Sequence, residues 1–142
     1  MLKVLIKKYE GCRLQAYRCP AGVWTIGYGT TVYPDGTPVK SGDIITQSYA
    51  DVLLEDYIDR HIRPLFTKFP YALTELQQCA VASLVYNIGV SAFLRSKLYK
   101  AICDKDYAEV CRQWDWYKAD GKVLLGLVKR RAEELYTFVN EL

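Results

Sequence analysis

Apolar residues near the start of the chain recur at the spacing of an α-helix. They fall on one side of that helix, with lysines on the other, and are Leu2, Leu5, Ile6 and Tyr9. The pattern predicts a short amphipathic helix over residues 2–10, and Gly11 is placed to end it.

Short runs rich in β-branched and aromatic residues follow this helix. Residues 14–18 and 23–28 are typical of two strands, joined by the turn Cys19-Pro20-Ala21-Gly22, with Pro second and Gly fourth as a type I turn prefers. A third short strand is expected over residues 31–33, before a second turn sequence. The three strands would form a small antiparallel sheet.

Beyond residue 42 the pattern changes to that of helices. Two sets of residues suit a capping box at a helix start: Ser48 with Asp51, and Thr74 with Gln77. The first helix is expected to stop at Pro64 and the second at Ile88, before Gly89. Further helices are predicted over residues 92–102, 106–116 and 124–140.

The order of these elements predicts an α+β fold with a small N-terminal sheet and a larger helical part. At 142 residues the chain fits a single domain, which would bury about two thirds of its unfolded surface. We expect a β lobe over about residues 13–45 and a helical lobe over about 46–142, which also includes the helix at residues 2–10.

Composition is that of a soluble globular protein, since half of the residues are apolar and a quarter are charged. The N-terminal residues lack the apolar core of a signal peptide, and no stretch approaches the ~20 apolar residues that span a bilayer. We therefore expect a protein that starts in the cytosol. The five cysteines form no CxxC pair, so neither a zinc site nor a disulfide framework is expected.

The net charge of the chain restricts the possible binding partners only slightly. The net charge of +3 comes from interspersed Lys and Arg, without the basic blocks of a dedicated nucleic-acid binder. Such an excess favours an anionic polymer, and bacterial walls, outer-membrane lipids and nucleic acid all qualify.

Glu10 is a candidate general acid because of its place in the first helix. It lies in the last turn, where the backbone carbonyls form the negative end of the helix dipole and disfavour a carboxylate. Shielding by the neighbouring sheet would act in the same direction and keep the acid protonated near neutral pH. Taken alone, this position is more often that of an ordinary surface glutamate at a frayed helix end, since most such residues are solvated.

The sequence around Glu10 favours the catalytic role over that of a surface residue. Residues 9–19 and 22–29, the latter including Thr-Ile-Gly-Tyr-Gly, resemble the phage-type lysozymes, the T4-like endolysins. In that family a Glu ends the first helix, an Asp or sometimes a Cys follows nine positions later, and a Thr comes six positions after that. Glu10, Cys19 and Thr25 match this triad without a gap.

The resemblance extends to the helical part of the chain. The residues that it would place along the far wall of the cleft are Tyr86, Asn87, Phe93 and Ser96. For these the alternative is core packing and helix termination. Arg130 or Arg131 resembles a family arginine that pairs with a carboxylate beside the cleft, and a solvated helix face is the alternative.

The family implies hydrolysis of the β-1,4 bond between N-acetylmuramic acid and N-acetylglucosamine in bacterial peptidoglycan. Glu10 would protonate the glycosidic oxygen, and Cys19 with Thr25 would hold the attacking water, which gives inversion. A covalent sugar intermediate on Cys19 with retention is the second possibility, and an inert Cys19 is the third. We expect Arg18 to favour the thiolate modestly.

The same resemblance implies a monomer without metal or cofactor. It would accumulate in the host cytoplasm until released to the cell wall or periplasm, without stable membrane insertion and without a nucleic-acid partner.

Three other functions are open at this point. A catalytically inactive lysozyme-like protein would bind peptidoglycan without cutting it. A cysteine hydrolase would need a histidine near its nucleophile, but the only one, His61, is predicted on a charged helix face. A nucleic-acid binder would need a basic stripe interleaved with aromatic residues, which the sequence lacks.

Overall fold

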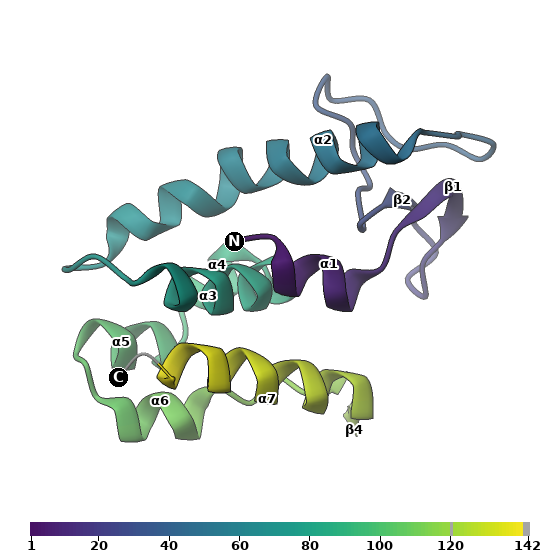
Figure 1. The fold of residues 1–142 in the computed structure, drawn as a ribbon. Helices are drawn as coiled ribbons and strands as arrows, with labels where there is room; N and C mark the ends of the chain where they lie inside the picture. Colours follow the sequence, from purple (N-terminus) through teal and green to yellow (C-terminus); the bar gives the residue numbers. More distant parts are fainter. Residues whose placement is uncertain (120, 141–142) are drawn as a thin grey trace.

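The computed structural model describes residues 1–119 and 121–140 and confirms the α+β fold. A two-stranded sheet lies at one end of the molecule and a group of helices at the other, with a long helix running between them (Figure 1). The main helices are α1 (Val4–Glu10), α2 (Gln47–Tyr57), α3 (Glu75–Ile88), α4 (Val90–Leu94), α5 (Lys97–Cys103), α6 (Tyr107–Gln113) and α7 (Leu125–Val139). The strands are β1 (Arg13–Arg18), β2 (Trp24–Gly27), β3 (Lys118–Ala119) and β4 (Lys122–Val123).

The β1–β2 hairpin forms directly after α1, as predicted. The Gly22 backbone N–H donates to the Cys19 carbonyl at 2.8 Å, which closes the predicted turn. The strands pair antiparallel with Tyr17 opposite Thr25. This hairpin carries Cys19 at its corner and Thr25 on the returning strand.

The predicted third strand at residues 31–33 is wrong. Within the described residues this sheet has only β1 and β2, and Val32 forms an isolated bridge with Pro38. The turn closes on itself, because the Tyr33 N–H donates to the Thr37 carbonyl at 2.8 Å and the Gly36 N–H to Tyr33 at 2.9 Å. Pro38 has no N–H to extend a ladder. The segment is therefore a loop that is free to line a pocket.

The first helix of the helical region begins earlier than predicted. Thr46, and not Ser48, is the N-cap of α2, and its hydroxyl accepts a hydrogen bond from the Tyr49 N–H at 3.1 Å. Thr46 is in the extended backbone conformation of a cap, whereas Ser48 is already inside the helix and exposed. The helix continues past residue 57 as a π-helical turn (Ile58–Ile62) and a 3-10 helix (Arg63–Lys68).

We expect Thr46→Ala to lower the free energy of unfolding by about 1 kcal/mol, because it removes this cap. Ser48→Ala should change it by less than about 0.5 kcal/mol, since an exposed helix position makes no capping contact. Urea unfolding of both variants checks this. A larger loss for Ser48→Ala would contradict the assignment of the cap.

The second predicted capping box is confirmed at the start of α3, where Thr74 and Gln77 bond to each other's backbone. The single helix predicted over 92–102 is instead two, because Ser96 adopts an extended conformation and caps α5 through the Tyr99 N–H at 3.1 Å. The helix predicted over 106–116 ends at Gln113, and the β3–β4 hairpin follows. Strands of two residues are too short to show the alternation by which strands are detected.

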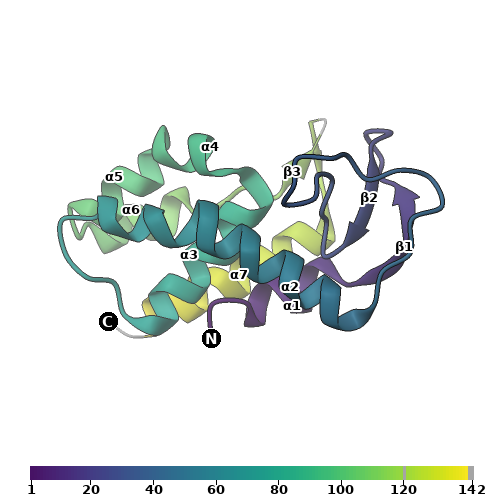
Figure 2. The same ribbon diagram turned by 90° about the horizontal axis from the view of Figure 1, so that it is seen from above.

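Helix α3 lies at the centre of the helical end and packs on α7, α1, α4 and the π-helical turn after α2 (Figure 2). Its residues 79–85 are all buried, and it packs most extensively on α7. The core continues through apolar side chains of neighbouring helices such as Leu54, Phe93 and Ile102. This packing brings the end of α1 against the first half of α7. Among the described residues, no helix is both long enough and apolar enough to cross a membrane.

Candidate active site

Glu10 ends α1 and faces Arg130 of α7. Its Oε1 atom accepts a hydrogen bond from Arg130 Nη1 at 2.7 Å, and its side chain is 21% exposed. Two influences on the carboxyl oppose each other: the C-terminal carbonyls of α1 disfavour a negative charge, whereas the guanidinium stabilises one. The structure thus answers which arginine meets Glu10.

Gly29 keeps the space over the second carboxyl oxygen open. A Cβ added to Gly29 would lie 3.7 Å from Glu10 Oε2 and 3.8 Å from the Tyr86 hydroxyl. Gly29 also has a φ of +99°, a conformation that L side chains rarely adopt. Oε1 therefore points to Arg130, while Oε2 faces Gly29.

A buried polar cluster holds Arg130 in place. Its Nη2 donates to the Ser83 carbonyl at 2.9 Å, and its Nε lies 3.3 Å from Glu134 Oε2. Glu134 is fully buried and also accepts from the Ser83 hydroxyl at 2.5 Å and from Trp114 Nε1 at 3.2 Å. The guanidinium is thus fixed on two sides, and Nη1 is left for Glu10.

Arg131 belongs to the same cluster but turns away from Glu10. Its Nη2 donates to Glu134 Oε2 at 2.9 Å and its Nη1 to Asn87 Oδ1 at 2.9 Å. Burial lowers the pKa of Arg131, and the facing Glu134 carboxylate opposes that effect. Arg131 therefore orients Asn87, which is exposed at the end of α3.

Cys19 and Thr25 come together across the hairpin turn. Hydrogen bonds from the Val23 and Ala21 backbone and from the Thr25 side chain lower the pKa of the Cys19 thiol, against the effect of desolvation. The Thr25 hydroxyl, which is buried, also lies 3.0 Å from the Val23 carbonyl and can give its single hydrogen to only one acceptor at a time. Arg18 is not among the main causes of this lowered pKa, and its guanidinium lies over the Trp24 ring at 5.1 Å.

The residues predicted along the far wall divide into two groups. Tyr86 lies near Glu10, and its hydroxyl donates to the Tyr28 carbonyl at 2.5 Å; burial raises the pKa of this phenol strongly. Phe93 is fully buried and packs on the rings of Phe69 and Tyr99. Ser96 bonds to the backbone as the cap of α5. Of these four residues Tyr86 lies beside Glu10, Asn87 is bound to Arg131, and the other two have the alternative roles of packing and helix capping.

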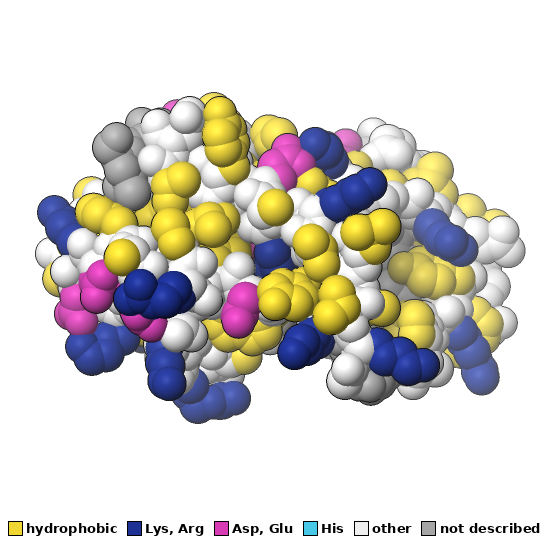
Figure 3. Space-filling view, turned by 90° about the horizontal axis from the view of Figure 1, so that it is seen from below, with side chains coloured by type: hydrophobic (Ala, Val, Ile, Leu, Met, Phe, Trp, Pro, Cys, Tyr) yellow, Lys and Arg dark blue, Asp and Glu magenta, His cyan; other side chains and the backbone are white. Residues whose placement is uncertain are grey.

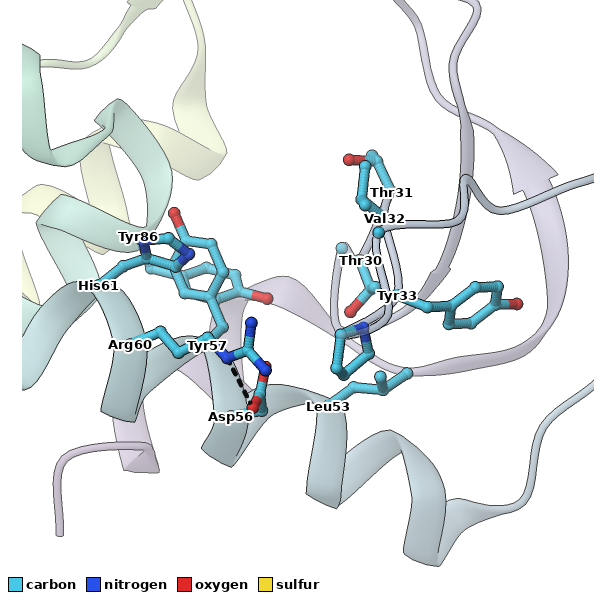
Figure 4. A pocket seen from close by; sticks show the side chains of 13 residues that line it. Thr30, Thr31, Val32, Tyr33, Leu53, Asp56, Tyr57, Arg60, His61 and Tyr86 are labelled. Atoms are coloured by element: carbon cyan, nitrogen blue, oxygen red, sulfur yellow. Dashed lines mark hydrogen bonds and ion pairs between the residues drawn. The ribbon is translucent and has the colours of Figure 1, made fainter.

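A pocket of about 510 Å³ opens next to Gly29 and Tyr86. One wall is the loop of residues 29–36, and the other is formed by α2 and the turn that follows it. In Figure 4, Tyr57, His61 and Tyr86 gather on one side of this space, and Arg60 extends into it with a bond to Asp56. Two residues that lie close to Glu10, Gly29 and Tyr86, thus also line this pocket.

Sequence reasoning did not identify the pocket residues of α2 or the roles of Ser83, Trp114 and Glu134. For Glu134 a signal existed, because it follows Arg130 by four residues and so lies on the same helix face. For Ser83 and Trp114 no local pattern in the sequence indicates a polar partner.

The charges on the surface are dispersed. On the face shown in Figure 3, Lys and Arg side chains are scattered over both ends of the molecule and do not form one block. Across residues 1–119 and 121–140, no three His, Cys, Asp or Glu side chains are grouped so as to hold a metal ion.

Comparison with known proteins identifies the family. The phage lysozyme family model matches residues 7–134. An endolysin of Acyrthosiphon pisum secondary endosymbiont phage 1 is 42% identical over 140 residues, which cover 95% of this chain and 92% of that protein.

Solved structures agree. The endolysin from Escherichia coli O157:H7 phage FAHEc1 has a TM-score of 0.86 at 29% identity, over 100% of this chain and 95% of that one. The muramidase domain of SpmX from Asticaccaulis excentricus has a TM-score of 0.81 at 31% identity, over 95% and 92%. The resemblance in the sequence is thereby confirmed: the chain belongs to the phage lysozyme family and is a lysozyme-type glycoside hydrolase.

Proposed function

We propose that the protein hydrolyses the β-1,4 bond between N-acetylmuramic acid and N-acetylglucosamine in bacterial peptidoglycan. Membership of the phage lysozyme family and the likeness to a muramidase domain support this choice of substrate. In this proposal Glu10 is the general acid, and Cys19 and Thr25 position the attacking water.

One observation carries the role of Glu10: the two carboxyl oxygens have different surroundings. Oε1 accepts the hydrogen bond of Arg130, and Oε2 faces Gly29, a residue that lines the pocket. A proton on Oε2 would therefore be directed at a glycosidic oxygen bound there. Arg130 fixes the carboxyl group and would stabilise the carboxylate that remains after the proton has left.

The lowered pKa of Cys19 supports a thiolate in the position where the family usually has a carboxylate. A thiolate can accept the proton of the attacking water, and the Thr25 hydroxyl oxygen can accept a second hydrogen bond from that water. The water oxygen then forms a bond to the anomeric carbon as the glycosidic bond breaks, and the leaving oxygen takes the proton of Glu10. Attack from the face opposite the leaving group inverts the configuration.

We expect peptidoglycan digestion to release reducing ends on N-acetylmuramic acid as the α-anomer, because a direct attack by water inverts the β-linkage. Proton NMR of the products within the first minutes distinguishes the anomers before they equilibrate. Mass spectrometry of acid-quenched protein should detect no sugar on Cys19.

A β-anomer together with a sugar adduct on Cys19 would contradict the inverting mechanism and favour a covalent intermediate. Peptidoglycan that binds the protein but releases no reducing ends would contradict the enzymatic function itself.

A further inference from the structure

The buried cluster behind Glu10 carries more positive than negative charge. Arg130 and Arg131 of α7 are only 4% and 2% exposed, and both contact the carboxylate of Glu134, which is fully buried. Two guanidinium charges thus share one carboxylate. One positive charge remains uncompensated within the cluster, and Glu10 is the group that meets it, through Arg130 Nη1 at 2.7 Å.

The phenols around Glu10 do not change this balance. Burial strongly raises the pKa of Tyr86 on α3, with a smaller effect from Tyr17 on β1, and burial together with a hydrogen bond to Glu133 raises the pKa of Tyr9 to about 12. These two phenols are therefore neutral at physiological pH. On the hairpin, the Arg13 guanidinium lies over the Tyr17 ring at 4.6 Å.

The charged residues of α1 next to Glu10 are paired elsewhere. Lys7 binds Asp51 at 3.1 Å, and Lys8 binds Glu133 at 2.8 Å. Each pair adds one charge of either sign. The electrostatic surroundings of Glu10 are therefore set by the two arginines and by Glu134.

A general acid must hold its proton until the substrate is bound, whereas a neighbouring guanidinium favours the carboxylate. Glu10 meets Arg130 directly and Arg131 at longer range. Burial lowers the pKa of Arg131, and the charge of Glu10 is among the influences that oppose this effect. Charges in such a buried cluster are screened less than charges in water. Without Glu134, both guanidinium charges would therefore act on Glu10 and drive its proton off.

We propose that Glu134 is a positioning residue that keeps Glu10 protonated, because its buried carboxylate offsets one of the two guanidinium charges. It acts through Arg130 and does not touch the substrate. The Ser83 hydroxyl and the Trp114 N–H, at 2.5 Å and 3.2 Å, stabilise its charge. This inference rests on the proposed role of Glu10 as the acid, but its test does not depend on activity.

The test follows the titration of Glu10 directly. In protein labelled with ¹³C at the glutamate carboxyl carbons, the Glu10 resonance is identified by its absence in Glu10→Gln, and its chemical shift is recorded against pH. Glu134→Gln, studied at a temperature where circular dichroism shows it folded, should lower the midpoint by about one pH unit, since one more positive charge acts on the carboxyl. Arg131→Gln should raise the midpoint by a similar amount, and it keeps the test possible even if Glu134→Gln does not fold.

Two further variants separate charge from structure. Arg131→Gln combined with Glu134→Gln restores the original net charge and should return the midpoint to that of the unaltered protein. Trp114→Phe is the matched control, because it removes a hydrogen bond to Glu134 without changing any charge, and it should leave the midpoint in place.

An unchanged midpoint in Glu134→Gln or Arg131→Gln would overturn the inference, and so would an equal shift in Trp114→Phe. The proposed function is judged separately by the release of reducing ends from peptidoglycan. If the unaltered protein released none, that function would fall, while the NMR titration would still decide whether Glu134 sets the protonation of Glu10.

Discussion

Replacing Glu10 with Gln is expected to slow the hydrolysis of peptidoglycan by about 10²- to 10⁴-fold, the usual contribution of a general acid. Gln has the shape of Glu and keeps an oxygen for Arg130 Nη1, but it has no carboxyl proton to give to the leaving group. The loss should therefore appear in kcat and leave the binding of the strand nearly unchanged. Release of reducing ends from purified peptidoglycan measures it.

Glu133→Gln is the matched control for this experiment. Glu133 lies on α7 and contacts α1. Its carboxylate accepts hydrogen bonds from Lys8 and from the Tyr9 hydroxyl, which leaves it occupied by those two groups. The control should keep the activity of the unaltered protein. If Glu10→Gln cleared peptidoglycan as fast as the unaltered protein, Glu10 would not be the acid.

Replacing Glu134 with Gln should cause the largest loss of stability among single changes at this site. Glu134 is fully buried and is the carboxylate that Arg130 and Arg131 share, at 3.3 Å and 2.9 Å. Removing its charge leaves a buried excess of positive charge, which typically costs about 3–5 kcal/mol. For a chain of this size that corresponds to a decrease in Tm of roughly 10–20 °C.

Thermal unfolding followed by circular dichroism measures this change, and Glu133→Gln again serves as the control. Glu133 precedes Glu134 on α7 but is 32% exposed, and its ion pair with Lys8 is largely solvated. Its loss should cost at most about 1 kcal/mol. Equal Tm values for the two variants would show that the buried charge of Glu134 adds no more to stability than the exposed charge of Glu133.

Elements whose signals are local were predicted well from the sequence. The amphipathic α1, the turn at Cys19 and the Thr74 capping box depend on neighbouring residues, and the structure has each of them. The prediction of a third strand was wrong for a reason that is not local. A strand needs a partner strand, whereas this segment forms its backbone hydrogen bonds within its own turn.

For the site, the sequence predicted only the features that follow from the spacing of residues along the chain. Arg130 and Arg131 are adjacent, and which of them meets Glu10 depends on how α7 is rotated against α1. Arg60 and His61 have the pattern of a solvated helix face, since the loop that makes them part of a pocket lies about thirty residues earlier. Neither arrangement leaves a periodic signal, because both arise from tertiary packing.

The ion pair between Glu10 and Arg130 joins positions 120 residues apart in the chain. Contacts of such long range cost more loop-closure entropy than local contacts do, which delays their formation. During synthesis on the ribosome, Arg130 emerges only after the 129 residues before it have been made. A nascent chain with α1 and the hairpin already folded would still lack this partner of its acid, so catalytic competence should appear only when α7 docks on α1.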